Sequence, residues 1–151
     1  MAKISGPLLD RIDLHIEVPA VKYKELSSKE SGEKSEATRT RVIQAREVQV
    51  KRFKGRKGLF ANADMQSKEI REFCKLDEAG EELLKMAITK LGLSARAYDR
   101  ILKVGRTIAD MAGSAGTRSE HVSEAIHYRS LIGGFIDWLD GLNFQGVSGF
   151  S

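Results

Sequence analysis

The chain has 151 residues, of which 41% are hydrophobic and 30% charged, and its net charge is +4. This composition is typical of one soluble globular domain, and the chain has no apolar run long enough to cross a membrane and no signal-peptide pattern. The single cysteine, Cys74, excludes an internal disulfide, so we expect a cytoplasmic protein without a membrane partner.

The first segment, residues 1–20, contains a strand-like pattern. Apolar residues alternate with polar ones up to Pro19: Ile12, Leu14, Ile16 and Val18 against Asp13, His15 and Glu17. We find no second strand pattern, and a lone strand cannot satisfy its own edges. The segment is therefore predicted to be extended or disordered here and to belong to a larger domain upstream. The polar face, with His15, is predicted to face solvent or a partner.

Residues 21–35 are polar and are predicted to be a flexible linker. A helix is predicted over 36–54, capped by Ser35 and ended by Gly55, with Val42, Ala45, Val48 and Phe53 facing inward. Residues 39–57 contain one acid, Glu47, and eight basic residues: Arg39, Arg41, Arg46, Lys51, Arg52, Lys54, Arg56 and Lys57. Such a cluster is either a DNA-binding surface or a solvated face, and the sequence leaves both open.

Four further helical segments are predicted. They follow Ser67, Asp77 and Ser94, with the last beginning near Ser119, and Gly92 and Gly113 end the two longest. Leu59 and Phe60 of the preceding loop are predicted to point inward. The fold class is therefore all-α, a small helical bundle over residues 36–131, and the glycine-rich tail 132–151 is predicted to be disordered. His121 and His127 are six residues apart and are not expected to share a metal.

Two segments resemble a known family. Residues 93–100, LSARAYDR, resemble the sensor 2 segment of the magnesium-chelatase-like AAA+ ATPases, in particular their ComM-like group, and residues 5–13, SGPLLDRID, resemble the end of their ATPase core. The resemblance implies that the chain is a C-terminal fragment with a lid-type bundle. It also implies that Arg96 contacts nucleotide phosphates and that Arg11 is an arginine finger. From residue type alone, Arg96 is a surface arginine, and Arg11 pairs with Asp10 or Asp13.

The sequence contains no phosphate-binding Gly-x-x-x-x-Gly-Lys loop, so the isolated chain is not expected to hydrolyse ATP. The resemblance implies a parent ATPase that uses ATP and Mg²⁺ in a homo-oligomeric ring, with its own AAA+ core and neighbouring subunits as partners. It favours DNA remodelling over a chelatase-type role. The alternatives are a stand-alone helical DNA-binding module and a protein-interaction module.

Overall fold

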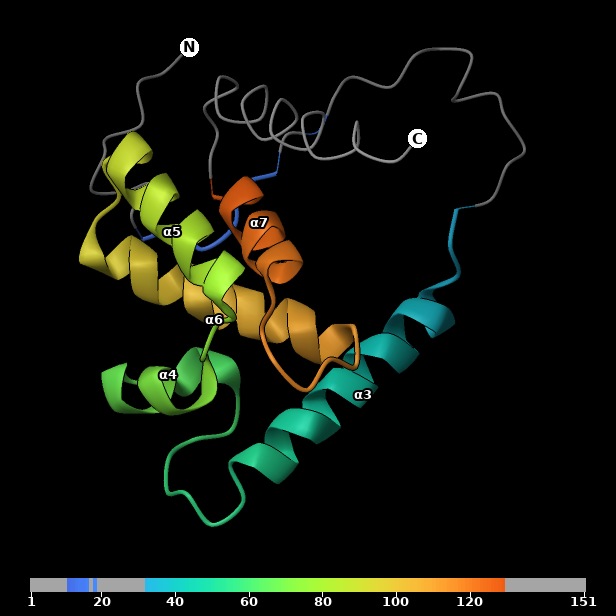
Figure 1. The fold of residues 1–151 in the computed structure, drawn as a ribbon. Coiled ribbons are helices and arrows are strands. Elements are labelled where there is room, and N and C mark those ends of the chain that lie inside the picture. Colours follow the sequence, from blue (N-terminus) through green and yellow to red (C-terminus); the bar gives the residue numbers. More distant parts are fainter. Residues whose placement is uncertain (1–10, 17, 19–31, 130–151) are drawn as a thin grey trace, which may run out of the picture.

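The computed structural model describes residues 11–16, 18 and 32–129 (Figure 1). This part of the chain forms five α-helices and one short 3-10 helix, and it contains no strand. The elements are α3 (Ser35–Arg52), η1 (Asn62–Asp64), α4 (Ser67–Phe73), α5 (Glu78–Leu91), α6 (Ala95–Met111) and α7 (Ser119–His127). The predicted all-α class is confirmed, whereas the predicted tail 132–151 lies outside the described residues.

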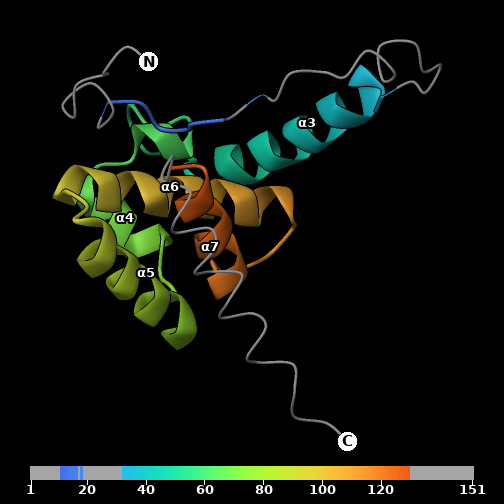
Figure 2. The same cartoon turned by 90° about the horizontal axis from the view of Figure 1, so that it is seen from above.

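Helix α6 is the centre of the bundle. It contacts α7, α3, α4 and η1, while α5 packs against α7 (Figures 1 and 2). Met65, Ile101, Val122 and Ile126 are each at most 1% exposed and form the middle of the core. Cys74 lies in the same core as a buried thiol, and burial raises its pKa to about 11. Burial of these apolar side chains is the main stabilising contribution to the bundle.

Most predicted helix ends are confirmed by their hydrogen bonds. Asp77 Oδ1 accepts from the Gly80 N–H at 2.9 Å, and Ser94 Oγ accepts from the Ala97 N–H at 3.2 Å. Gly92 and Gly113 follow α5 and α6 with φ of 59° and 67°, a conformation that glycine adopts without steric cost. The predicted Ser35 and Ser67 caps are wrong, because both residues are already helical and the caps are Lys34 and Gln66.

The predicted inward set of the first helix is confirmed only in part. Ala45 and Phe53 are buried as predicted, but Val42 and Val48 are exposed, and the polar Gln49 of α3 is buried beside Ala45 and Phe53. The Gln49 side-chain oxygen accepts from the Asn62 N–H at 3.2 Å, so a buried polar contact fixes the face that points inward. The N-terminal half of α3 extends away from the other helices (Figures 1 and 2). In the loop after α3, Leu59 packs on the core as predicted, but Phe60 is exposed.

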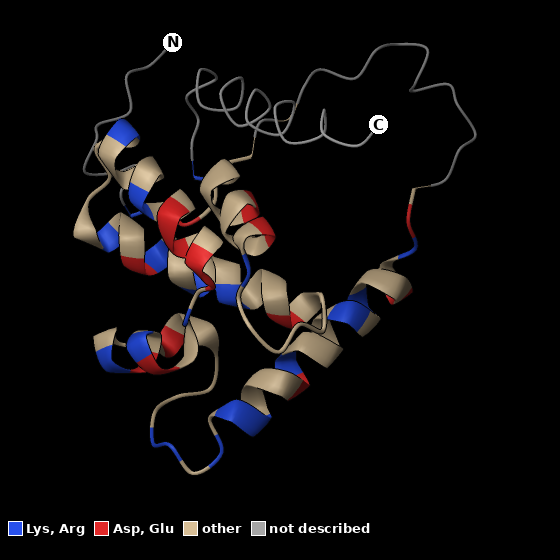
Figure 3. Cartoon of the chain, viewed as in Figure 1, with Lys and Arg blue, Asp and Glu red and all other residues tan. Residues whose placement is uncertain are grey.

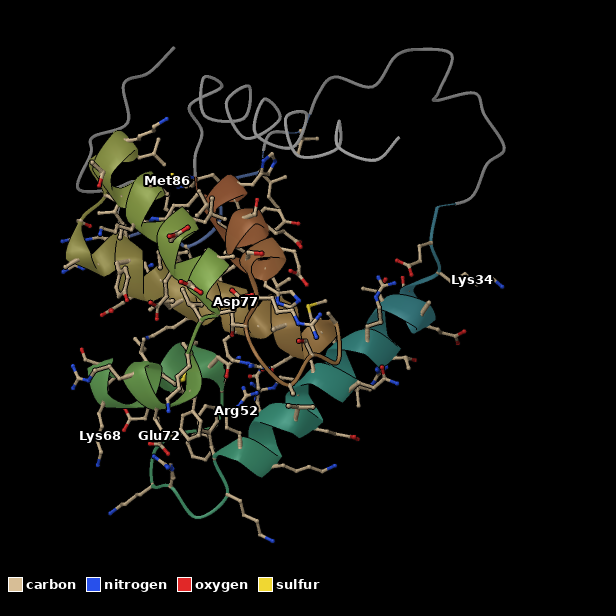
Figure 4. All side chains as sticks on the ribbon, viewed as in Figure 1. Lys34, Arg52, Lys68, Glu72, Asp77 and Met86 are labelled. Carbon is tan, nitrogen blue, oxygen red and sulfur yellow. The ribbon has the colours of Figure 1, made fainter. Side chains whose placement is uncertain are left out.

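The carboxylate of Asp110 joins α3, η1 and α6. Arg52, which points from α3 toward α6 (Figure 4), donates to Oδ1 and Oδ2 at 2.5 and 2.7 Å. Arg106 donates to Oδ1 from Nε at 3.0 Å and from Nη2 at 2.7 Å, and Asn62 donates to Oδ2 at 2.8 Å. Arg106 also donates to the carbonyls of Ala115 and Ser114. One buried carboxylate therefore holds four segments of the chain together.

This cluster makes the stability of the fold depend on pH. Burial by itself disfavours the charged form of Asp110, but the hydrogen bonds from Arg52, Asn62 and Arg106 outweigh it, and the pKa of Asp110 is lowered. A carboxyl group whose pKa is lower in the folded state stabilises the fold above its unfolded pKa, about 3.9. That contribution is lost as the pH falls through the folded pKa.

We expect Asp110→Asn to lower the free energy of unfolding at pH 7 by about 3–5 kcal/mol, because it leaves two buried guanidinium groups without their anion. Because asparagine does not titrate, the free energy of unfolding of the variant should also fall less than that of the unaltered chain between pH 7 and pH 3. Urea unfolding followed by circular dichroism between pH 3 and 7 measures both effects. Asp99→Asn, on the same helix, is the matched control and should cost less than about 1 kcal/mol. Equal losses in the two variants would contradict the role given to Asp110.

Candidate functional site

The junction between α5 and α6 positions Arg96. Gly92 ends α5 and Ser94 caps α6, so the turn between the two helices is only three residues long, and the start of α6 is fixed relative to the end of α5. Arg96 lies in the first turn of α6, where its side chain is exposed and makes no hydrogen bond or ion pair with the described residues. The N–H groups and the dipole at this end of a helix favour an anion. Arg96 is therefore a cation available to an anionic ligand.

Arg100, one turn further along α6, holds the N-terminal segment against the helix. Its Nη1 donates to the Arg11 carbonyl at 2.9 Å, and its guanidinium forms an ion pair with Asp13. Residues four apart lie on the same side of a helix, so Arg11 and Arg96 come to the same side of α6. The Arg11 side chain is exposed, and its suggested partner Asp13 is paired with Arg100 instead. Sequence reasoning missed Arg100, although it lies in the segment that carries the resemblance.

Residues 11–16 lie against the bundle with the side that carries His15, although the sequence predicts that this side faces solvent or a partner. His15, predicted on the outward face, is half-buried: its N–H donates to the Tyr128 carbonyl at 2.6 Å, and its Nδ1 lies 3.3 Å from the Arg129 carbonyl. Arg129 in turn donates to the Ile12 carbonyl at 2.7 Å. The apolar residues that share the other face are exposed: Ile12, Leu14, Ile16 and Val18. These four side chains therefore form an exposed apolar row along the segment.

Basic residues recur along α3 and the following loop (Figure 3). Their side chains differ in exposure and in pairing. Arg52 is the clear exception among the candidate DNA contacts, because its side chain is only 12% exposed and is bound to Asp110. Arg41 pairs with Glu33, and Arg56 pairs with Glu72 on α4. These hydrogen bonds lower the pKa of Glu33 and of Glu72.

Arg46 donates to Gln49 at 3.3 Å and is otherwise exposed. Four further basic residues are exposed without a hydrogen bond or ion pair to the described part of the chain: Arg39, Lys51, Lys54 and Lys57.

A groove of about 500 Å³ lies between residues 13–16, α6 and α7. Its apolar lining includes Leu14, Val104, Ile108 and Met111. Its charged lining comes from both sides: Asp13, Arg100, Lys103 and Glu124. No pattern in the sequence indicates this groove, because residues about 90 positions apart form it.

His121 has a structural role at the start of α7. His121 is buried, and its Nδ1 accepts from the Arg118 N–H at 3.0 Å, which caps the start of α7. Among the described residues, no group of three His, Cys, Asp or Glu side chains is placed to hold a metal ion. Within the same residues, no helix has the length and apolar content that a membrane crossing requires.

Two family models match different parts of the chain. Residues 32–129 match the model described as magnesium chelatase, subunit ChlI C-terminal, and residues 1–26 match the model described as magnesium chelatase, subunit ChlI. The boundary between the two matches falls between the N-terminal segment and the helical bundle. The bundle described above therefore corresponds to one family domain, and the segment before it to another.

Three relatives are similar to most of this chain, and in each the similarity covers a quarter of the relative. Competence protein ComM of Haemophilus influenzae is 44% identical over 131 residues, which is 86% of this chain and 25% of that protein. The protein YifB of Escherichia coli is 42% identical over 130 residues, and Rv2897c of Mycobacterium tuberculosis is 32% identical over 129 residues, each covering 85% of this chain and 25% of the relative. The chain spans about a quarter of the length of these relatives. It belongs to the magnesium chelatase subunit ChlI C-terminal family.

Proposed function

We propose that this chain is the lid of a magnesium-chelatase-like AAA+ ATPase. In this proposal Arg96 contacts the phosphates of the nucleotide bound by the core of its own subunit, and Arg11 reaches the nucleotide of a neighbouring subunit. The observation that carries the proposal is that both arginine side chains are exposed, have no hydrogen bond or ion pair with the described residues, and belong to segments that meet on the same side of α6. A guanidinium matches the charge and geometry of phosphate oxygens.

The open apolar row along the N-terminal segment supports a missing core. Ile16 is 69% exposed and Val18 is 82% exposed, which is costly for side chains of this size unless another surface covers them. The separate family match of residues 1–26 also supports this reading, because that segment matches a different family model from the bundle. We infer that the ATPase core covers this row.

The residues present fit one part of a nucleotide site. They supply cations for phosphate oxygens, but the sequence has no glycine-rich loop to cradle them, and the described residues contain no acidic cluster for Mg²⁺. ATP and Mg²⁺ would therefore be held by the core. The nucleotide supplies the γ-phosphoryl group, and a guanidinium placed at this group stabilises the charge that develops in phosphoryl transfer.

We propose DNA as the substrate of the parent ring, with α3 as a contact surface. The specific observation is a set of exposed basic residues that have no acidic partner in the part of the chain that the structure describes: Arg39, Arg46, Lys51, Lys54 and Lys57. Arg52 is left out because its guanidinium binds Asp110 and stabilises the fold. Arg41 and Arg56 are left out because they are paired with Glu33 and Glu72. A stand-alone DNA-binding module would use the same surface without nucleotide.

In a protein that joins this chain to its ATPase core, we expect Arg96→Ala to weaken ATP binding by roughly 10–100-fold. This is the effect of losing a charged hydrogen bond of about 1.5–3 kcal/mol. Fluorescent nucleotide titration measures the affinity. Arg71→Ala, which removes an exposed arginine from α4, is the control and should leave binding unchanged. If Arg96→Ala binds ATP like the control, the phosphate contact is refuted.

For Arg11→Ala in the same protein, we expect a loss of ATP turnover of about 10³–10⁵-fold with little change in ATP affinity. Rings that mix Arg11→Ala with Arg96→Ala subunits provide the sharper test. If Arg96 acts in its own subunit and Arg11 in the next, some junctions in the mixed ring contain both arginines and turnover recovers. A mixed ring as inactive as the two single variants would contradict the division of roles.

DNA contact by α3 predicts a steep dependence on salt. Lys51→Ala with Lys54→Ala should weaken binding of duplex DNA and make the slope of log affinity against log salt shallower by roughly two, since each phosphate contact contributes about 0.9. Lys75→Ala with Lys85→Ala, which removes two exposed lysines elsewhere, is the control. An unchanged slope in the α3 variant would mean that α3 is a solvated face.

A further inference from the structure

Phe60 is the most exposed aromatic residue in the part of the chain that the structure describes, although the sequence predicts that it points inward. Its exposed fraction is 69%, compared with 40% for Tyr98, the other aromatic residue that is exposed among the described residues. A ring of this size loses free energy in water that burial would recover. Single exposed apolar residues are common on protein surfaces, so the surroundings of Phe60 decide whether it is a binding residue.

The loop that carries Phe60 is anchored on both sides of the ring. Before it, Arg56 Nη1 donates to Glu72 Oε2 on α4 at 2.9 Å, and Leu59 packs on the core. After it, the carboxylate of Asp64 in η1 accepts from the Phe60 main-chain N–H at 2.9 Å. The main chain therefore holds the Phe60 ring outward in a fixed place, and a ligand that contacts the ring has little main-chain ordering to impose.

The same loop carries positive charge (Figure 3). Lys54 and Lys57 are exposed and have no hydrogen bond or ion pair with the described residues. Lys57 is three residues before Phe60, a separation of at most about 11 Å along the chain. Two acids contact the loop, but Glu72 binds a guanidinium and Asp64 binds main-chain N–H groups. An exposed ring and two available cations therefore lie together, which suits an anionic ligand that also has a flat apolar face.

Single-stranded DNA is a ligand of this kind. Proteins bind it with basic side chains along the phosphates and with aromatic side chains on which successive bases stack. In a duplex the base faces are covered by neighbouring base pairs, so an aromatic ring on a protein surface cannot reach them. We propose that Phe60 stacks on an unpaired base of DNA while Lys54 and Lys57 contact phosphates of the same strand. This inference rests on the DNA contact proposed for α3 and names the form of DNA that the surface prefers.

Fluorescence anisotropy of the full chain with a labelled oligothymidine of about 12 nucleotides, and with a duplex of the same length, tests the stacking. We expect Phe60→Leu to weaken binding of the single strand by roughly 5- to 100-fold and to leave duplex binding unchanged. The slope of log affinity against log salt should stay the same, because the ring carries no charge. Phe60→Tyr keeps a flat ring and should bind like the unaltered chain. Tyr98→Leu makes the same change at the other exposed aromatic residue and is the matched control.

Circular dichroism and thermal unfolding establish that the variants are folded. The stacking is refuted if Phe60→Leu binds the single strand like the unaltered chain or like Tyr98→Leu. It is also refuted if Phe60→Tyr loses as much affinity as Phe60→Leu, or if duplex binding falls equally.

The variant Lys51→Ala with Lys54→Ala separates the stacking from the DNA contact of α3. If this variant binds both forms of DNA more weakly while Phe60→Leu binds both normally, the phosphate contacts stand and only the stacking is wrong. If the unaltered chain binds neither form, the DNA contact itself is refuted, and the stacking is refuted with it.

Discussion

The fold depends on how one buried carboxylate is satisfied. Asp110 is 4% exposed, and without Arg52, Arg106 and Asn62 its charge would be strongly destabilising at that depth. Each of these partners comes with its own segment, so the same hydrogen bonds set the angle of α3, the place of η1 and the loop between α6 and α7. The N-terminal half of α3 extends beyond the bundle because the contacts that hold this helix are concentrated toward its C-terminal end.

The parts of the fold that sequence reasoning predicted are those determined locally. The Asp77 and Ser94 caps and the Gly92 and Gly113 ends each depend on atoms within a few residues, so residue type and spacing were enough. The inward face of α3 was predicted only in part, because Gln49 is buried and Arg52 is largely buried by hydrogen bonds to other segments, although a pattern of hydrophobicity assigns both to the surface. The outward face of residues 11–16 was predicted wrongly for the same reason. The main-chain carbonyls of Tyr128 and Arg129, more than 100 residues away, hold His15 against the bundle.

The candidate site shows the same limit. Arg96 was identified through a resemblance, and its position in the first turn of α6 followed from the Ser94 cap. Its relation to Arg11 was not readable, because it depends on Arg100 bonding a carbonyl 89 residues away. The groove beside it also depends on distant segments that only the fold brings together. Long-range hydrogen bonds to main-chain carbonyls carry no pattern in a single sequence, and three of them help to hold residues 11–16 against the bundle.

Those three hydrogen bonds also constrain how the proposed site could work. Arg100 holds the Arg11 carbonyl, Arg129 holds the Ile12 carbonyl, and the Tyr128 carbonyl holds the His15 N–H. As long as they persist, residues 11–16 move with α6 and α7 as one body. If Arg96 and Arg11 serve two neighbouring nucleotides, a displacement of the lid at one nucleotide is carried to the other through α6. A change in one site would thus bias the next by moving an arginine, without any rearrangement inside the bundle.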